Sequence, residues 1–558
     1  MSAEAPPAVQ MLNVQIDGTW MQFPKGTRVI EACAQAQKFI PRYCYHPKLS
    51  SPGNCRMCMV ELGMPKMTPD RKPVLGPDGK PELNWIPRPQ ISCAQDVSEG
   101  MGIRTDSPMV QECRKGVMEF LLINHPLDCP ICDQAGECRL QEFSVEYGDS
   151  GSRFLEHKVK KPKNVELGPR VTLDAERCIL CSRCIRFMQE IANDDVLGFI
   201  DRGSFSTIAC HPDRKLDSNY SLNTVDICPV GALTSTDFRF KMRVWFLKET
   251  KSIDVNCGTG CNITIGSRGN VIYRITPREN NEVNSVWLPD SHRLNFKYLF
   301  RGDRLTMPTV KAEPVEWRTA IAIAAELFKA QPAAAMALVA SGRMTNEELF
   351  LAKRLVATLG ITKFDIVPRK GESDGLLISE DRNPNTNGAR LLGLTGKRPG
   401  AKLKKIAEGV DTGEIKCVIT FGEDLMRAGV IEAGPPRATI VAMDILPNRT
   451  TTHAAVVLPA SGWAEKRGSM INVKGRLQRL NQAVTAPGQA RDDWEILRDL
   501  IQAVSGSNGI AGIEDVFKAM AAEVPEFADL SLSKIGDLGL PVLSMKERKD
   551  KAAEVQVG

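Results

Sequence analysis

Alternating hydrophobic and polar positions predict a β-hairpin close to the start of the chain. Apolar residues occupy every second position over 12–16, and the Asp17-Gly18 pair that follows is a strong signal for a two-residue turn. Residues 19–23 then return as a second strand. The chain is therefore expected to open with a small β-rich module.

Two helical patterns follow this hairpin. Thr27 is placed to cap a helix that carries Val29, Cys33 and Ala36 on one face. A longer pattern with helical spacing runs over residues 108–123. Between them lie loops rich in Cys, Gly and Pro, so this part of the chain is expected to be short of regular structure.

Beyond about residue 301, helical patterns alternate with short apolar strands. An Ala-rich helix is predicted over 318–329, and Thr345 with Glu348 forms a capping box for another helix. Buried strands are predicted at 336–340, 417–421 and 439–443. Strands that alternate with helices favour an α/β domain with a mainly parallel sheet.

Composition excludes several functional classes. The 558 residues suggest three or four domains, and 42% hydrophobic and 25% charged residues are ordinary values for a globular protein. The formal charge is +5, and no basic run has interleaved aromatic residues, which disfavours nucleic acid as a partner. No apolar stretch approaches the ~20 residues of a membrane span. Residues 1–10 lack the pattern of a signal or transit peptide.

Cysteine content changes this ordinary picture. The chain has 17 cysteines, and only Cys417 lies beyond Cys261. Without an export signal, the thiols are expected to meet a reducing cytosol, where metal ligation or catalysis is more common than disulfide formation. The sequence thus divides into a half suited to metal binding and a half that is poor in metal ligands.

The first cysteine group surrounds a Cys-x2-Cys turn, which places two thiolates on one loop as a polynuclear iron centre requires. Pro and Gly residues in the preceding segment favour a loop that presents backbone N–H groups to a cluster. A zinc site with four cysteine ligands is the alternative. The group consists of Cys44, Cys55, Cys58 and Cys93.

The second group combines one imidazole with three thiolates within fourteen positions. This donor set suits either zinc or a [4Fe–4S] cluster, and a neutral His in place of a thiolate raises the potential of a cluster. The group consists of His125, Cys129, Cys132 and Cys138.

The third group has the Cys-x2-Cys-x2-Cys spacing with a remote Cys-Pro, which is the bacterial ferredoxin signature of a [4Fe–4S] cluster. Met188 occupies the position where a two-cluster ferredoxin has a further cysteine, so this module is expected to hold one cluster. The group consists of Cys178, Cys181, Cys184 and Cys228.

The remaining six cysteines lack a complete ligand set. Cys257 and Cys261 form a Cys-x3-Cys pair, which is too few ligands for a cluster or a closed zinc site without other donors. The others have no cysteine neighbour at ligand spacing and are expected to be small buried apolar side chains: Cys33, Cys113, Cys210 and Cys417.

Together, the motifs resemble those of the large iron–sulfur subunit of respiratory complex I, NADH:quinone oxidoreductase. The resemblance covers about residues 14–241 and includes the His125-Pro-Leu-Asp-Cys129 box and the Cys228-Pro-Val-Gly-Ala-Leu233 segment. It implies one [2Fe–2S] cluster on the first group and [4Fe–4S] clusters on the second and third. The later part, including 346–349, 455–459 and 464–478, is similar to molybdopterin oxidoreductases, a fold that this family keeps without the cofactor.

The resemblance implies a multidomain α/β and α+β protein. A β-grasp ferredoxin-like module at the N-terminus is followed by [4Fe–4S] modules and a truncated molybdopterin-oxidoreductase-like α/β domain. The expected boundaries are 1–97 for the [2Fe–2S] domain, 98–150 for the His-containing module, 151–245 for the ferredoxin-type module, 246–302 for a degenerate fourth-cluster module, 303–544 for the α/β domain and 545–558 for a disordered tail.

One departure from the family concerns the fourth module. Some bacterial members carry another [4Fe–4S] cluster on Cys-x2-Cys-x3-Cys-x27-Cys. Here the second and third positions are Cys257 and Cys261, whereas the first falls on Asp254 and the fourth on Pro289. Proline cannot ligate iron, so this cluster is expected to be lost.

The function that the resemblance implies is one-electron relay from a flavin in a neighbouring subunit towards quinone. The chain would act as a subunit of an oxidoreductase and translocase of the respiratory chain, with no catalytic residue of its own. No GxGxxG follows a strand and no P-loop is present, so NADH and FMN are expected to bind to another subunit. The expected location is peripheral, on the cytoplasmic face of the bacterial plasma membrane, with membrane contact only through the assembly.

Three other functions remain open from sequence. A diaphorase-type subunit of a soluble hydrogenase or formate dehydrogenase complex could share all three motifs. A catalytic formate dehydrogenase or iron-only hydrogenase subunit would need metal ligands in the C-terminal half, which offers only Cys417. A scaffold with zinc or empty sites is the third possibility, and it predicts a protein without iron.

Overall fold

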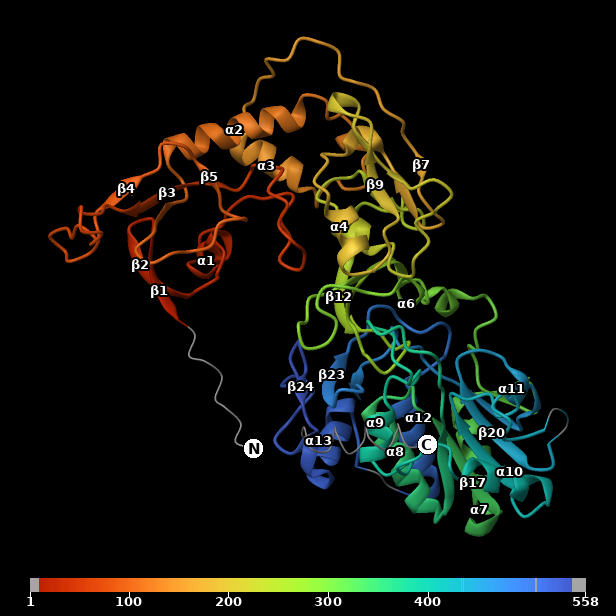
Figure 1. The fold of residues 1–558 in the computed structure, drawn as a ribbon. Coiled ribbons are helices and arrows are strands. Elements are labelled where there is room, and N and C mark those ends of the chain that lie inside the picture. Colours follow the sequence, from red (N-terminus) through yellow and green to blue (C-terminus); the bar gives the residue numbers. More distant parts are fainter. Residues whose placement is uncertain (1–9, 433, 435, 507–508, 544–558) are drawn as a thin grey trace. The chain divides into compact units, whose positions relative to one another are not determined.

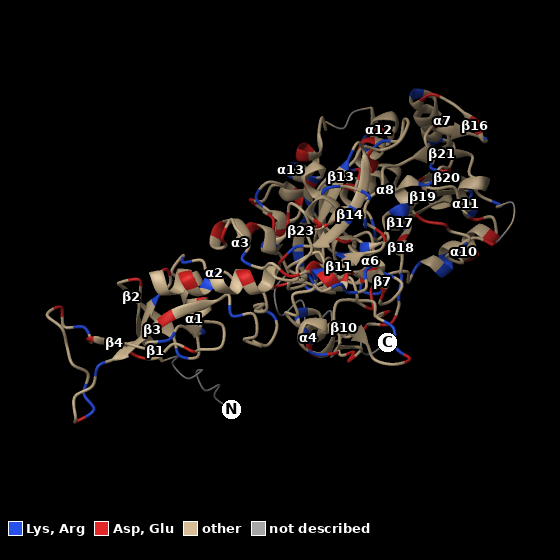
Figure 2. Cartoon of the chain, turned by 90° about the horizontal axis from the view of Figure 1, so that it is seen from above, with Lys and Arg blue, Asp and Glu red and all other residues tan. Residues whose placement is uncertain are grey.

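The computed structural model describes residues 10–432, 434, 436–506 and 509–543 (Figure 1). The chain forms two compact units, Met1–Trp245 and Phe246–Gly558. In Figure 2, the positions of acidic and basic residues are interspersed along the ribbon of both units. Among the described residues, none of the helices has the length and apolar content needed to cross a membrane. The disordered tail expected over 545–558 lies outside the described residues.

The first unit begins with the predicted hairpin, extended into a mixed sheet. Asp17 and Gly18 both have positive φ angles, 46° and 88°, as a tight hairpin turn of this hand requires. The sheet order is β2-β1-β6-β3-β4, with β5 paired to β3, and only β1 and β6 run parallel. Its strands are β1 (Met11–Ile16), β2 (Thr19–Pro24), β3 (Met59–Pro65), β4 (Leu83–Trp85), β5 (Gln90–Ile91) and β6 (Gly102–Arg104).

Helix α1 (Val29–Gln35) packs into the core of this module, but its start differs from the prediction. Val29 and Cys33 are buried, as the pattern indicated. The N-cap is Arg28 rather than Thr27, and no side chain caps the helix. The Thr27 hydroxyl instead donates to the carbonyl of Pro24 at 2.7 Å, because it closes the turn before the helix. The predicted cap is therefore wrong.

The rest of the first unit is held by short elements, as the loop-rich sequence indicated. The predicted helix over 108–123 is present as α2, and the Ser107 side chain accepts from the amide of Val110 as its cap. The helices are α2 (Pro108–Leu122), α3 (Arg139–Tyr147), α4 (Arg183–Glu190) and α5 (Asn223–Asp226). The strands are β7 (Val165–Glu166), β8 (Val171–Leu173), β9 (Leu197–Ile200), β10 (Thr207–Cys210) and β11 (Leu233–Ser235).

The second unit starts with a three-stranded antiparallel sheet in the order β12-β13-β14. Its elements are β12 (Lys248–Ile253), β13 (Asn262–Arg268), β14 (Val271–Pro277) and the one-turn helix α6 (Asp290–Arg293). The segment that joins β12 to β13 carries Cys257 and Cys261. A second small sheet contains β22 (Gly468–Ile471), β23 (Arg476–Leu480) and β24 (Leu540–Pro541).

A seven-stranded sheet forms the centre of the second unit, in the order β16-β15-β21-β20-β19-β17-β18. The last five strands in this order run parallel, which confirms the predicted α/β domain. The strands are β15 (Thr309–Val310), β16 (Glu313–Pro314), β17 (Met336–Ser341), β18 (Lys363–Val367), β19 (Cys417–Phe421), β20 (Thr439–Asp444) and β21 (Val456–Pro459).

Helices cover both faces of this sheet, so its strands are apolar on both sides. Leu338 on β17 packs into the core shared with α7, α8, α12 and α13, whereas its neighbour Val339 packs into the core shared with α10. The Thr345–Glu348 capping box is present at the start of α8. The helices are α7 (Trp317–Lys329), α8 (Asn346–Leu359), α9 (Thr386–Leu391), α10 (Leu403–Asp411), α11 (Arg449–His453), α12 (Asp493–Ser505) and α13 (Ile513–Glu523).

The four cysteines without ligand-spaced neighbours differ in burial. Cys33 and Cys417 are 0% and 1% exposed and belong to hydrophobic cores, as expected. Cys113 and Cys210 are only partly buried. Cys210 lies on β10, and its Sγ donates to the carbonyl of Leu167 at 3.3 Å. The expectation of buried apolar side chains therefore fails for these two residues.

Candidate metal centres

The first cysteine group comes together around Cys44 in the loops that follow α1 and precede β3. The thiols of Cys55 and Cys93 hydrogen-bond to that of Cys44, and Cys58 hydrogen-bonds to Cys93. The backbone amide of Cys44 also donates to the Sγ of Cys55 at 3.5 Å. Four thiols from positions as distant as 44 and 93 thus face one another.

Electrostatics at this group favour a negative charge on Cys44. Hydrogen bonds from the Cys55 and Cys93 thiols lower the pKa of Cys44 well below its ordinary value. The hydrogen bond between Cys93 and Cys44 raises the pKa of Cys93, and the hydrogen bond between Cys93 and Cys58 raises it further. A single thiolate is therefore stabilised only by its protonated neighbours. Iron, which is a cation, would stabilise all four thiolates together.

The second group lies between the ends of α2 and α3. Cys129 begins a 3₁₀ turn that ends at Ile131, and Cys138 is the N-cap of α3. Burial raises the pKa of the Cys138 thiol, and the charges of nearby Cys132 and Cys129 raise it further. The three cysteines of the second group therefore lie near one another, and Cys129 is exposed.

His125 has the features of a metal ligand. Its Nδ1 atom is buried and has no hydrogen-bond partner among the residues that the structure describes. Burial, with the positive charges of Arg177 and Lys158, lowers the pKa of His125 to about 4. The imidazole is therefore neutral at pH 7, which is the form that binds a metal. An unpaired buried nitrogen is costly, and a bound metal would remove that cost.

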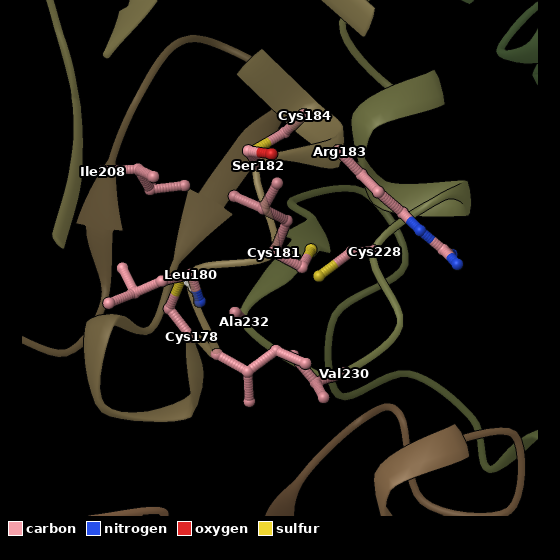
Figure 3. A pocket seen from close by; sticks show the side chains of 12 residues that line it. Cys178, Leu180, Cys181, Ser182, Arg183, Cys184, Ile208, Cys228, Val230 and Ala232 are labelled. Atoms are coloured by element: carbon pink, nitrogen blue, oxygen red, sulfur yellow. Dashed lines mark hydrogen bonds between the residues drawn. The ribbon is translucent and has the colours of Figure 1, made fainter. Parts of the chain in front are cut away.

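The four cysteines of the third group all line one small cavity (Figure 3). In Figure 3 the Cys181 and Cys228 sulfurs point towards each other. The remaining wall is mostly aliphatic, contributed in part by Leu180, Ile208 and Val230. Burial raises the pKa of Cys181 to about 11, so a free thiol would stay neutral there. An apolar cavity lined by four cysteines suits a cubane cluster, which needs four separated thiolates.

The second and third groups touch through the Cys-Pro-Val-Gly loop. The Cys138 thiol donates to the carbonyl of Pro229 at 3.9 Å. A Cβ atom at Gly231 would lie 2.2 Å from the Cys132 sulfur, which only a glycine avoids. The ligand loop of one group thus packs directly against a ligand of the other.

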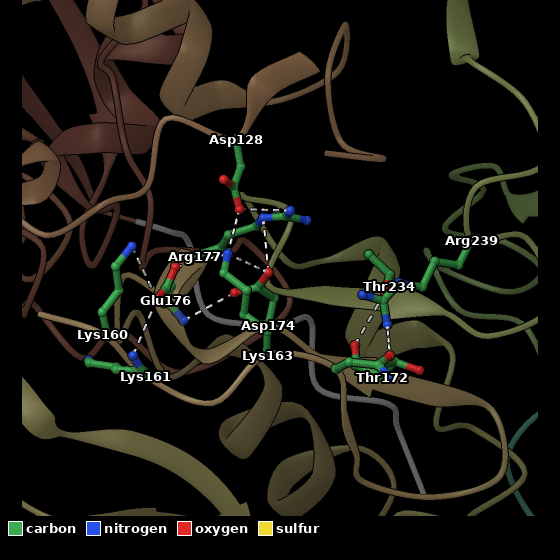
Figure 4. Close-up of polar contacts among 11 residues, drawn as sticks. Asp128, Lys160, Lys161, Lys163, Thr172, Asp174, Glu176, Arg177, Thr234 and Arg239 are labelled. Atoms are coloured by element: carbon green, nitrogen blue, oxygen red, sulfur yellow. Dashed lines mark hydrogen bonds and ion pairs between the residues drawn. The ribbon is translucent and has the colours of Figure 1, made fainter. Parts of the chain in front are cut away.

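A network of charged residues also joins these two groups (Figure 4). Arg177, which precedes the ligand Cys178, is 4% exposed and pairs with Asp128 at 3.0 Å and Asp174 at 3.2 Å. Asp128 belongs to the box that contains His125. Lys163 adds a second cation, 2.5 Å from Asp128. Because charges of both signs are paired, the network can be buried at a tolerable cost in desolvation.

Two side chains join the first group to the third. Arg183 on α4 donates to the carbonyls of Tyr45 at 2.6 Å and Ile227 at 3.1 Å. Those carbonyls follow Cys44 and precede Cys228 directly. Asn54 adds a hydrogen bond to the carbonyl of Leu180 at 3.2 Å. The three predicted ligand sets therefore lie together within the first unit.

The fourth module shows a residue that sequence reasoning missed. Asp254 and Cys257 lie beside His292, and the His292 Nδ1 is 2.7 Å from an Asp254 carboxylate oxygen. The family spacing points to Pro289, which is the N-cap of α6, and His292 is one helical turn further along. A search for any ligating residue within one turn of position 289 would have found it.

Sequence comparisons match known families along most of the chain. The matches are a 2Fe-2S iron-sulfur cluster binding domain (9–108), the NADH-ubiquinone oxidoreductase-G iron-sulfur binding region (114–153), the NADH-quinone oxidoreductase subunit 3 ferredoxin-like domain (168–234), the NADH-ubiquinone oxidoreductase NDSU1/NuoG-like 4Fe-4S domain (247–297) and molybdopterin oxidoreductase (366–503). These matches confirm the expected kinds of domain and their order.

Two relatives that match along more than nine-tenths of their own length decide the family. The NADH-ubiquinone oxidoreductase 75 kDa subunit of Reclinomonas americana is 40% identical over 92% of this chain and 91% of its own length. An NADH-quinone oxidoreductase subunit of Rickettsia felis is 31% identical over 97% of this chain and 94% of its own length. This chain belongs to the family of large iron–sulfur subunits of NADH-quinone oxidoreductase. The predicted role as an electron-relay subunit of that oxidoreductase complex is thereby confirmed.

The family relationship also bears on the alternatives. These matches extend over almost the whole chain, so a hydrogenase or formate dehydrogenase subunit is not favoured. A solved NAD+-reducing [NiFe]-hydrogenase chain is 27% identical, with 42% of this chain and 91% of that chain covered and a TM-score of 0.35. The Rickettsia felis alignment extends over 658 positions, more than the 558 residues here. This family member is therefore shorter than that relative inside the matched region.

Proposed function

We propose that this chain relays electrons through three iron–sulfur clusters and performs no substrate chemistry itself. The observation that carries the proposal is the meeting of three four-residue ligand sets within one compact unit. The proposed ligands are Cys44, Cys55, Cys58 and Cys93 for a [2Fe–2S] cluster, His125, Cys129, Cys132 and Cys138 for one [4Fe–4S] cluster, and Cys178, Cys181, Cys184 and Cys228 for another.

The donor chemistry of each set supports this assignment. In the Cys44 group, hydrogen bonds from neighbouring thiols lower the pKa of Cys44 and so favour its thiolate, the form that ligates iron. The buried Nδ1 of His125, which has no hydrogen-bond partner among the described residues, is available to bind a metal. The Cys178 group surrounds an apolar cavity. Iron–sulfur clusters supply reversible one-electron chemistry when bound at such sites.

Side chains near the ligand sets would set the path of the electrons and the redox potentials of the clusters. Arg177 faces Cys132 and precedes Cys178, so its positive charge acts on both [4Fe–4S] sites. Buried Tyr43 is close enough to Cys55 and Cys138 for their charges to raise its pKa, in addition to the larger effect of burial. The neutral His125 leaves its site less negative than four thiolates would, which raises the potential.

The α/β domain is proposed to act as a scaffold without molybdopterin. In open α/β sheets, ligands bind at the carboxyl ends of the strands. Here Arg369, just after β18, forms two hydrogen bonds to Glu423, just after β19, at 2.6 and 2.5 Å. Glu423 is 2% exposed. An internal ion pair occupies this edge, which supports the absence of a cofactor. The boundaries 1–97, 98–150, 151–245, 246–302 and 303–544 remain part of the proposal.

Family membership supports the remaining parts of the proposal. The partners would be the flavin- and NADH-binding subunit and other peripheral-arm subunits of complex I, and neither FMN nor NAD would bind to this chain. The location would be the cytoplasmic face of the bacterial plasma membrane, with membrane contact only through the assembly.

The test is to measure iron and acid-labile sulfide on the anaerobically purified full chain, with EPR after reduction. The proposal predicts about ten iron atoms per chain and three sets of cluster signals. Cys228→Ser should remove about four iron atoms, whereas Cys417→Ser, a matched change in a buried strand, should remove none.

Either of two results would overturn the proposal. Zinc with little iron would exclude electron relay by this chain and would support the alternative that it is a scaffold. About fourteen iron atoms per chain would mean that the Cys257 and Cys261 module also holds a cluster.

A further inference from the structure

Three metal-ligating side chains meet at the start of the second unit, away from the proposed clusters in sequence. The ligand atoms of Asp254, Cys257 and His292 all lie within 4.8 Å of one another. The three residues are only 3%, 0% and 7% exposed. Within the described residues, no other group of three or more Cys, His, Asp or Glu meets this distance limit.

These distances match one ion better than a cluster. Bond lengths of ~2.0–2.3 Å to a tetrahedral zinc ion place neighbouring ligand atoms ~3.3–3.8 Å apart. A cubane holds each thiolate on a different iron atom, so its ligands stand farther apart. No three of the proposed cluster ligands, all of them among the described residues, lie within 4.8 Å of one another, as expected for ligands shared among several iron atoms. The family match over 247–297 describes a 4Fe-4S domain, but this module has only two cysteines.

We propose that this module binds a single zinc ion in place of that cluster. Asp254, Cys257 and His292 supply a carboxylate, a thiolate and an imidazole, all of which are common zinc ligands. Cys261 lies outside this group of three, but it is fully buried and its backbone carbonyl accepts from the amide of Asp254 at 2.8 Å, so it is the proposed fourth donor. The ion would link the β12–β13 loop to α6. It would thus hold these two segments together, as a cluster bound to both would do.

The loop that carries the two cysteines is held in place before any metal binds. The amide of Gly258 donates to the carbonyl of Asp381 at 2.8 Å. The side chains of Asn472 and Gln478 donate to the carbonyls of Thr259 at 3.0 Å and Gly260 at 2.8 Å. Each residue between Cys257 and Cys261 is therefore fixed by another element, which reduces the entropy cost of binding.

The carboxylate is positioned in the same way. One Asp254 oxygen accepts from the amide and the side chain of Asn256, at 3.2 and 2.5 Å, which leaves the other facing His292. Hydrogen bonds of this kind orient ligands at metal sites. An ordinary buried Asp–His pair would explain the 2.7 Å contact, but not why the buried Cys257 sulfur lies within 4.8 Å of both groups.

Charge and proton balance are consistent with zinc. Zn²⁺ would displace the thiol protons and the proton shared by Asp254 and His292 into solvent. With both thiolates, the carboxylate and a neutral imidazole, the site would carry one net negative charge. No electron transfer accompanies this binding.

The test measures zinc and iron separately on the anaerobically purified full chain, and on Cys257→Ser, His292→Gln and the control Cys417→Ser. We expect one zinc per chain in the wild type and in the control, and at least a tenfold loss in the other two variants. Iron content and cluster EPR signals should stay unchanged in all four proteins, so this test can fail without the relay function failing.

X-ray absorption at the zinc edge of the wild-type protein keeps the proposal testable even if a variant does not fold. It should show sulfur at ~2.3 Å together with nitrogen or oxygen at ~2.0–2.1 Å. Wild-type protein without zinc, a shell of four sulfurs, or zinc retained in both site variants would overturn the proposal. Extra iron that disappears in Cys257→Ser would overturn it in favour of a cluster.

Discussion

Arg186 on α4 donates from Nη2 to the backbone carbonyl of the proposed ligand Cys44 at 2.6 Å, although 142 positions separate the two residues. The same guanidinium donates to the carbonyl of Ser50 and, at 3.1 Å, to the Ser182 hydroxyl. Arg186 is 8% exposed, so it leaves no room for water to replace these bonds. It therefore fixes the [2Fe–2S] ligand loop to the ferredoxin-type module.

The first prediction concerns this contact. Arg186→Ala should lower the free energy of unfolding by about 1.5–3 kcal/mol, because buried carbonyls lose a charged donor. Urea denaturation of the anaerobic full chain, followed at the visible absorption of the clusters, measures the change. Arg88→Ala, at an exposed position, is the control and should have little effect. Equal stability of the two variants would contradict the prediction.

A second prediction follows from the contact between Gly231 and Cys132. Gly231→Ala would place a Cβ 2.2 Å from the Cys132 sulfur, so the ligand must move. The variant should lose about four iron atoms and the EPR signal of the His-ligated cluster, whereas the [2Fe–2S] signal should persist. Iron analysis and EPR of the reduced protein measure both effects.

The control for that variant is Gly116→Ala on α2. A Cβ at Gly116 meets nothing within 4 Å, and alanine favours a helix by up to about 1 kcal/mol over glycine. Its iron content should equal that of the wild type. Full iron content in Gly231→Ala would show that the loop can adjust to the added methyl group.

The third prediction concerns the charge of Arg177 between the two [4Fe–4S] sites. Arg177→Gln removes a buried cation that faces Cys132, which should lower the midpoint potential of the His-ligated cluster by on the order of tens of millivolts. Redox titration followed by EPR measures the shift. Arg239→Gln, the control, removes a partly exposed cation that donates to the Asn164 side chain, and it should shift the potential less.

The fourth prediction concerns Lys466, which is 6% exposed and pairs with Glu348 at 2.8 Å and with Asp493. Lys466→Met leaves two buried carboxylates without a cation, which should cost about 3–5 kcal/mol of stability at pH 8. Lys404→Met, at an 88% exposed side chain, is the matched control. Denaturant unfolding of the second unit within the full chain measures both variants.

The stability of this variant should also depend on pH. Burial and the charge of Asp493 already raise the pKa of Glu348 to about 8. Between pH 4.5 and 8 the folded state therefore binds a proton that the unfolded state releases, and stability falls as pH rises. Without Lys466 that decline should be steeper, so the variant should lose less stability at pH 5 than at pH 8. A pH-independent difference from the wild type would contradict this.

Local patterns in the sequence were enough to predict many of the secondary-structure elements. The Asp17-Gly18 turn, the Thr345–Glu348 capping box and the buried strand at Cys417 all depend on residues within a few positions of one another. The failed cap at Thr27 shows the limit of this reasoning. Its hydroxyl had a second acceptor, the Pro24 carbonyl, and pattern alone does not show which contact forms.

The ligand groups could be proposed from sequence because cysteines at fixed short spacings have few other uses in a reducing environment. The sequence by itself determined the kinds of module, their order and the relay function. Only the tertiary structure brought His292 to Asp254 and Gly231 to Cys132, across 38 and 99 positions. Such meetings depend on how whole elements pack, and packing is a property of the folded chain that no local pattern encodes.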